Sequence, residues 1–248
     1  MTSITAVKMC KLSALAYSDA EEIVQELEKL DYDDFRYFDR SGTKGFVAYS
    51  YKYKELVVCF RGTQPKDLND KLANLKAWPK KAREKGRVHS GFANACDKVY
   101  DEIVEYINSL KLPQNTKLIC AGHSLGAAIA TIVASRLDAD ELYTFGSPRV
   151  GNRAFVDEMT KDNIKHYRFV NNNDIVTNVP FTLMGYKHHG ELIYINFYGN
   201  IREMTSWRRT KDEFRGRWYA LLKRQPFDGT FDHSIALYYK KLLKNVST

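Results

Sequence analysis

The sequence predicts an α/β fold with a mostly parallel central sheet and helices on both faces. Two observations predict it. Short apolar runs of β-branched character alternate along the chain with segments of helical periodicity. The chain has 248 residues, of which 44% are hydrophobic and 13% aromatic, which is enough for a substantial core. We therefore expect one domain over residues 1–248.

The elements follow from local patterns taken in chain order. The first thirty residues carry apolar side chains at helical spacing, and a β-rich stretch follows at 35–38 and 45–51. Buried strands are expected at 55–60, 118–121, 141–145, 166–170 and 192–197, and helices at 99–110, 125–137 and 234–243. In parallel sheets, sites form beyond the carboxyl ends of the strands, so functional residues are expected there.

The net charge of +8 is concentrated in two segments. Residues 64–90 hold eight basic against three acidic side chains, and residues 202–224 hold the same numbers. Such segments are typical of surfaces that meet anionic partners. No nucleic-acid-binding motif accompanies the charge, so nucleic acid is not an expected partner.

The four cysteines indicate a reducing compartment. Cys10, Cys59, Cys96 and Cys120 form no CxxC pair, and two of them lie in expected core strands. The amino terminus lacks a basic start followed by a long apolar run, and no apolar stretch approaches the ~20 residues of a membrane span. We expect four reduced thiols and a cytoplasmic protein that contacts membranes, if at all, at its surface.

One pentapeptide, Gly122-His123-Ser124-Leu125-Gly126, lies between an expected strand and an expected helix. G-x-S-x-G in this context is typical of a nucleophile elbow. The glycines let strand and helix approach closely, and the turn aims the helix amino terminus at the serine hydroxyl, which favours developing negative charge. Ser124 is therefore the candidate nucleophile, although a degenerate elbow without catalysis would have the same sequence.

A serine nucleophile needs a histidine base and a carboxylate that orients the base. With an elbow of this type the chain order is serine, carboxylate, histidine, which leaves His188, His189 and His233 as candidate bases. Asp174 directly follows an expected strand and is preferred as orienter over Asp232, which is the neighbour of His233. Because adjacent residues of a strand point apart and no acidic cluster accompanies His188 and His189, we expect no metal site there.

Several motifs in order resemble the class 3 lipase family, the triacylglycerol lipase-like α/β-hydrolases of filamentous fungi and plants. Besides the elbow they are F-R-G-T at 60–63, V-H-S-G-F at 88–92, T-F-G-S-P-R-V-G at 144–151, N-N-D-I-V at 172–176, H-G-E-L at 189–192 and D-H at 232–233. One departure is Thr177, which stands where family members often have proline, with Pro180 following later. The resemblance spans about residues 57 to 233.

The resemblance implies a Ser124, His233 and Asp174 triad, with backbone N–H groups of Thr63 and Leu125 as the oxyanion hole. It implies a carboxylester hydrolase that cleaves lipid-like esters through an acyl-enzyme, with no metal or organic cofactor. The alternative is a lipase-like interaction or signalling protein that keeps the fold without turnover. The same resemblance places a lid at about 64–87, where Leu68, Leu72 and Leu75 form a narrow apolar stripe.

A basic, aromatic insertion is expected at about 199–229. It carries Trp207, Phe214, Trp218 and Tyr219 among its arginines. Two interpretations stand: the aromatic side chains pack on the core of a solvated helix, or they form a surface for anionic lipid that combines aromatic anchoring with charge.

Overall fold

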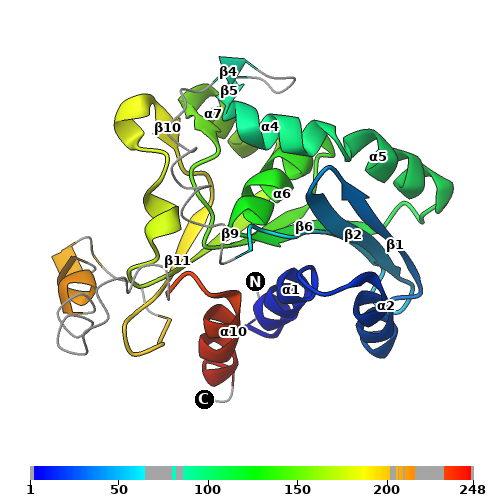
Figure 1. Ribbon diagram of the computed structural model, residues 1–248, viewed down its shortest axis with the longest axis horizontal. Coiled ribbons are helices and arrows are strands. Elements are labelled where there is room, and N and C mark those ends of the chain that lie inside the picture. Colours follow the sequence, from blue (N-terminus) through cyan, green and yellow to red (C-terminus); the bar gives the residue numbers. More distant parts are fainter. Residues whose placement is uncertain are drawn as a thin grey trace.

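The computed structural model describes residues 3–64, 80–81, 86–201, 205, 207–208, 210–215 and 232–246. Within this part of the chain, seven strands form the central sheet in the order β1-β2-β3-β6-β7-β9-β11 (Figure 1). Their bounds are Asp34–Arg40 (β1), Thr43–Ser50 (β2), Glu55–Phe60 (β3), Lys117–His123 (β6), Glu141–Phe145 (β7), Lys165–Asn171 (β9) and Glu191–Ile195 (β11).

Most neighbouring strands of this sheet run parallel. The pairs from β3 through β6, β7 and β9 to β11 are parallel, whereas β1, β2 and β3 pair antiparallel at one edge. The predicted mostly parallel sheet is therefore confirmed. The antiparallel edge corresponds to the β-rich stretch expected near the amino terminus.

Helices cover both faces of the sheet, as predicted. Helices α4 (Ser90–Asp97), α5 (Tyr100–Ser109), α6 (Leu125–Arg136) and α7 (Arg153–Lys161) share one hydrophobic cluster with one face of the strands. Helices α1 (Ser3–Leu15), α2 (Ala20–Lys29) and α10 (Ile235–Lys244) share the other cluster. Along β3 the alternation is direct, because Val58 joins the first cluster while Val57 and Cys59 join the second.

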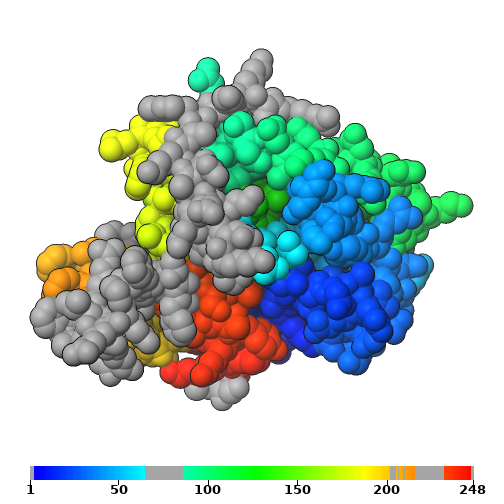
Figure 2. Space-filling view, in the orientation of Figure 1, coloured from blue at the N-terminus to red at the C-terminus, as the bar shows by residue number. Residues whose placement is uncertain are grey.

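The two ends of the chain meet on the second face. Helices α1 and α10 pack against each other, and Figure 2 shows them side by side in blue and red. The residue Asp19 caps α2 by accepting from the Glu22 amide, and Ile23 and Leu27 turn the apolar side of α2 into the core. Residues before position 30 therefore help to build the layer beneath the sheet.

A smaller antiparallel sheet was not predicted. It has the order β10-β8-β5-β4, with strands of two residues each: Lys80–Lys81 (β4), Arg87–Val88 (β5), Gly151–Asn152 (β8) and Tyr186–Lys187 (β10). The helices α4 and α7 were likewise not predicted. Two short 3₁₀ helices, η2 (Ile175–Asn178) and η3 (Thr182–Met184), follow β9.

The parallel strands place their carboxyl ends at one edge of the sheet. The segments that leave this edge are the loop after β3, the turn between β6 and α6, the turn after β7 and the loop after β9. The predicted lid lies largely outside the described residues. The four cysteines are free and buried, and no helix of the described residues is long and apolar enough to cross a membrane.

Candidate active site

The turn between β6 and α6 has the geometry of a strained elbow. Ser124 has φ 59° and ψ −128°, a conformation rare for a residue with a side chain, and its amide donates to the Phe145 carbonyl at 3.0 Å. A methyl group on Gly122 would lie 2.5 Å from the Gly126 backbone, and one on Gly126 would lie 2.2 Å from the Phe60 carbonyl oxygen. Both glycines are therefore required by the close approach of α6 to β6 and β3.

The structure brings His233 and Asp174 together. The Nδ1 atom of His233 lies 2.9 Å from each carboxylate oxygen of Asp174, and both side chains are buried. Because a carboxylate only accepts, Nδ1 carries a proton, and in the neutral imidazole Nε2 then carries the lone pair. That Nε2 atom is buried and has no hydrogen-bond partner among the described residues. An imidazole with this tautomer can accept a proton from a nucleophile.

Two further groups hold the Asp174 carboxylate. The Val176 amide donates to Oδ1 at 3.0 Å, and the Tyr238 hydroxyl of α10 donates to Oδ2 at 2.6 Å. Burial and the neighbouring Asp174 raise the pKa of Tyr238 well above its usual value, so the hydroxyl stays protonated as a donor. The Thr177 hydroxyl donates to the Asp174 carbonyl at 2.8 Å, so this threonine helps to close the turn after Asp174.

Asp232 has a different role from Asp174. Its carboxylate accepts from the Asn171 and Asn172 side-chain amides at 3.3 and 3.2 Å and from the Asn173 backbone amide at 3.2 Å. The Lys241 ammonium group lies 3.9 Å away. Asp232 therefore joins the loop before α10 to the segment after β9, and so fixes the backbone on either side of the contact between Asp174 and His233.

The loop after β3 lies against the elbow. A methyl group on Gly62 would lie 2.5 Å from the His123 carbonyl oxygen and 2.9 Å from Cβ of Ser124. Thr63 is the next residue of this loop, and Leu125 is the first residue of α6. The loop after β3 and the first residue of α6 therefore both lie beside Ser124.

The remaining histidines make structural contacts. Nε2 of His188 lies 2.9 Å from the Thr177 carbonyl, and Nδ1 of His189 lies 3.1 Å from Nδ1 of His166. Burial lowers the pKa of all three imidazoles, to about 4 for His189. No cluster that could hold a metal is found in the part of the chain that the structure describes. His89 caps α4 by accepting from the Gly91 amide at 3.1 Å.

A model of the class 3 lipase family matches residues 57–184, slightly more than half of the chain. The matched segment includes most of β3, the elbow and the loop of Asp174. The chain belongs to the class 3 lipase family. The fold agrees with this assignment. The triacylglyceride lipase of Rhizomucor miehei superimposes on the chain with a TM-score of 0.69 and is 26% identical in sequence. The superposition covers 77% of this chain and 80% of that one.

Two curated class 3 lipase relatives show the extent of the similarity. The secreted mono- and diacylglycerol lipase 1 of Fusarium solani is 33% identical over 156 residues, which are 60% of this chain and 46% of that protein. The lipase of Rhizopus niveus is 31% identical over 185 residues, which are 69% of this chain and 47% of that protein. The chain thus spans about half the length of the curated relatives it matches.

The class 3 lipase match ends before His233 and begins after Tyr17. The place of His233 in the site therefore rests on its contacts with Asp174. The sequence analysis did not identify Tyr17 or Tyr238, whose hydroxyls contact site residues, nor the contacts that Asp232 makes. Tyr238 lies within an amphipathic helix, where a tyrosine at a core position gives no separate signal.

Proposed function

We propose that this class 3 lipase chain is a carboxylester hydrolase in which Ser124 is the nucleophile, His233 the general base and Asp174 the residue that orients His233. The observation that carries the proposal is the pairing of His233 Nδ1 with both Asp174 oxygens at 2.9 Å, which leaves a buried Nε2 lone pair. The strained Ser124 elbow supplies a hydroxyl of the kind that such a base activates.

In the proposed reaction, His233 Nε2 takes the proton of the Ser124 hydroxyl as the serine oxygen attacks the ester carbonyl. The backbone amides of Thr63 and Leu125 stabilise the oxyanion that forms. His233 then gives its proton to the departing alcohol, which leaves an acyl group on Ser124. Water attacks this ester by the same route in reverse, and the carboxylic acid is released.

The amino terminus of α6 supports this assignment of charge. Ser124 precedes α6, so the helix dipole places partial positive charge beside the serine, where negative charge develops in the proposed reaction. Asp174 favours the positive charge that His233 gains when it takes the proton. The helix dipole thus favours the negative charge of the proposed step, and Asp174 favours the positive charge. Both groups are in place before substrate binds.

The proposed substrates are lipid-like esters, including acylglycerols. The support is the family, together with the relative from Fusarium solani, which is named as a mono- and diacylglycerol lipase. Activity of the whole protein on acylglycerols remains part of the proposal, as does a cytoplasmic location with contact at membrane surfaces. The role of Ser124 as nucleophile is the part of the proposal that one experiment tests directly.

That experiment is hydrolysis of short- and long-chain p-nitrophenyl esters by the wild type and by Ser124→Ala. We expect turnover by the wild type and loss of about three to six orders of magnitude in kcat without the nucleophile. Equal, slow hydrolysis by both proteins would contradict catalysis and favour the lipase-like interaction protein. Thermal unfolding of Ser124→Ala is the control for folding.

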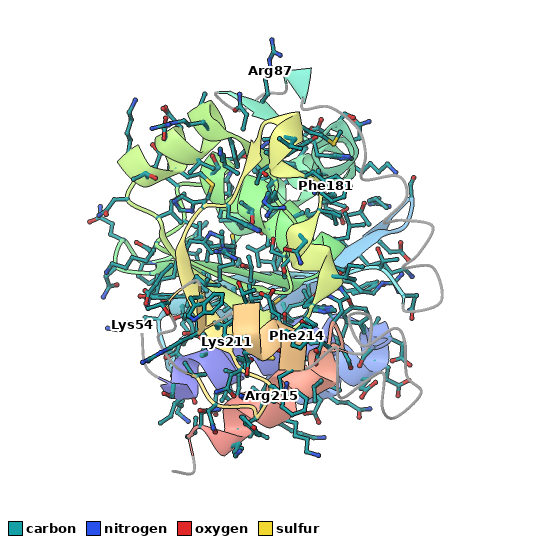
Figure 3. The ribbon with its side chains drawn as sticks, turned by 90° about the vertical axis from the view of Figure 1, so that its left-hand side faces the viewer. Lys54, Arg87, Phe181, Lys211, Phe214 and Arg215 are labelled. Carbon is teal, nitrogen blue, oxygen red and sulfur yellow. The ribbon has the colours of Figure 1, made fainter. Side chains whose placement is uncertain are left out.

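We also propose that part of the basic, aromatic insertion contacts anionic lipid. Trp207 and Phe214 are each 67% exposed, and Lys211, whose ammonium group lies 4.8 Å from the Trp207 ring, falls between them at helical spacing. Figure 3 shows Lys211, Phe214 and Arg215 together on this short helical segment. Trp218 and Tyr219 lie outside the described residues. An aromatic face with cations beside it suits the interface of an anionic membrane.

The described part of this segment is held to the rest of the protein by Asp212. The Asp212 carboxylate is buried and accepts from the Phe197 amide at 2.8 Å and from the Tyr194 hydroxyl at 3.2 Å. Sedimentation with neutral and phosphatidylserine-containing vesicles tests the proposal. We expect binding to the anionic vesicles, weakened in a Trp207→Ala, Phe214→Ala variant and kept in Ile4→Ala, a change at another exposed apolar residue. Equal, negligible binding to both vesicle types would contradict it.

A further inference from the structure

A tyrosine from the amino-terminal layer reaches the proposed catalytic centre. Tyr17 lies just after α1, and its hydroxyl oxygen is 2.7 Å from Nδ1 of His123, the residue before Ser124. The Gly62 backbone donates a hydrogen bond to the same Tyr17 oxygen. The contact is tight, since a methyl group on Gly62 would lie 2.2 Å from that oxygen. Tyr17 therefore touches both the loop after β3 and the elbow.

His123 continues this contact to the loop of His233. Its Nε2 atom lies 2.6 Å from the His233 carbonyl oxygen, and the two imidazole rings pack with centroids 4.4 Å apart. A carbonyl only accepts, so Nε2 carries the proton. Burial and the nearby His233 lower the pKa of His123 well below its usual value, so the ring holds one proton and Nδ1 accepts.

The direction of every hydrogen bond is thereby determined. The Gly62 N–H donates to the Tyr17 oxygen, the Tyr17 hydroxyl donates to His123 Nδ1, and His123 Nε2 donates to the His233 carbonyl. A single continuous chain joins the loop that carries Thr63 to the loop that carries His233. This chain of hydrogen bonds runs next to Ser124, because His123 precedes Ser124 in the sequence.

We propose that Tyr17 and His123 are positioning residues that hold the oxyanion loop and the loop of His233 in one fixed alignment around Ser124. The inference rests on the proposed ester hydrolysis. The alignment matters most in the transition state, when the oxyanion donors and the base must act on the same tetrahedral centre. The loss of this chain therefore lowers kcat more than it raises KM.

The first test is Tyr17→Phe, which removes only the hydroxyl. With p-nitrophenyl butyrate as substrate, we expect kcat to fall about tenfold, the factor that corresponds to one hydrogen bond, and KM to change less than about twofold. The matched control is Tyr32→Phe, which removes a buried hydroxyl beneath the same face of the sheet, one that donates to Glu55. The control is expected to lose stability while its kcat is unchanged.

The second test asks whether Tyr17 and His123 act as one unit. His123→Gln keeps a donor and an acceptor at the end of the side chain, whereas His123→Leu keeps neither. We expect the glutamine variant to retain more kcat than the leucine variant. We also expect the double variant Tyr17→Phe, His123→Leu to be no slower than His123→Leu alone. The proposal would be overturned if the double variant lost kcat by the product of the two single losses. It would also be overturned if the glutamine and leucine variants lost kcat equally.

A third measurement does not depend on turnover. In protein labelled with ¹⁵N-histidine, the imidazole nitrogen shifts should show His123 as the neutral Nε2–H tautomer at neutral pH. A charged His123 or an Nδ1–H tautomer would overturn the hydrogen-bond chain even in an active enzyme. An inactive wild type with the expected tautomer would instead contradict the proposed function. An unchanged kcat in folded Tyr17→Phe would refute the positioning role itself.

Discussion

Gly146 is the residue at which a single methyl group tests the geometry of the site most severely. It follows β7 in the T-F-G-S-P-R-V-G motif and has φ +60°. A Cβ added there would lie 2.5 Å from Oδ2 of Asp174 and 2.8 Å from Nδ1 of His233. The variant Gly146→Ala therefore inserts a methyl group directly against the contact between these two side chains.

The size of the effect follows from these distances. Ordinary contact begins near 3.4 Å, so the Asp174 carboxylate must move by about 0.9 Å to admit the methyl group. A misplacement of about 1 Å at catalytic groups costs on the order of 100-fold in rate. The positive φ adds a separate penalty of about 1–2 kcal/mol to the free energy of folding, because a side chain is disfavoured in this conformation.

Gly42→Ala is the matched control for this experiment. Gly42 has φ +83° but no atom within 4 Å of an added Cβ, so the variant carries the backbone penalty without the clash. We expect urea unfolding to show destabilisation in both variants, larger in Gly146→Ala because the clash adds to the backbone penalty. We expect p-nitrophenyl ester hydrolysis to show a loss of kcat of about 100-fold in Gly146→Ala alone. Full activity of folded Gly146→Ala would refute the assignment of the Asp174 and His233 pair to catalysis.

Three further predictions concern other parts of the molecule. Asp174→Asn should lower kcat by about 10³–10⁴-fold, because the asparagine amide no longer holds the tautomer of His233. Kinetics measure the loss, and circular dichroism checks that the fold is retained. A loss below tenfold would contradict the role of Asp174. The pKa of His189 is about 4 in the fold against 6.5 in the open chain, so the unfolded state binds more protons between these values. The contribution of neutral His189 to the free energy of unfolding is therefore complete above pH 6.5 and is lost as the pH drops toward 4, so stability should fall less steeply in His189→Gln. The same pH dependence of the urea midpoint in both proteins across this range would argue against it. Gly45→Ala places a Cβ 2.1 Å from the Cys59 carbonyl oxygen. Unfolding experiments should therefore show a loss of about 2–3 kcal/mol in the free energy of unfolding, with normal kcat per folded molecule. Unchanged stability would count against the tight packing of β2 on β3.

Strands β3, β6 and β7 could be predicted because each is a short, mostly apolar run that is buried along most of its length. The elements that were missed lack such a signal. The strand β8 has two residues, which is too short for any periodicity to be visible. The helix α4 begins with Ser90 and Gly91 and is held by the His89 cap and by burial of Phe92 and Cys96. These contacts exist only after the chain has folded.

In the site, too, residues within one contiguous motif could be predicted, whereas contacts between residues far apart in the sequence could not be predicted from local pattern alone. Ser124 could be predicted because its motif and its strand-turn-helix context are contiguous. The pairing of Asp174 with His233 needed the chain order of a known fold, since 59 residues separate them. Tyr17 could not be identified, because its partner His123 lies 106 residues away and a lone tyrosine after a helix resembles any core residue.

The most direct test of the account is to locate the nucleophile chemically. The protein is treated with a p-nitrophenyl alkylphosphonate, and the adduct is mapped by peptide mass spectrometry in the wild type and in His233→Asn. The account predicts a phosphonyl group on Ser124, formed with release of p-nitrophenol and loss of esterase activity, and much slower labelling when His233 is replaced. An adduct at another residue, or labelling of Ser124 at the same rate in both proteins, would contradict it.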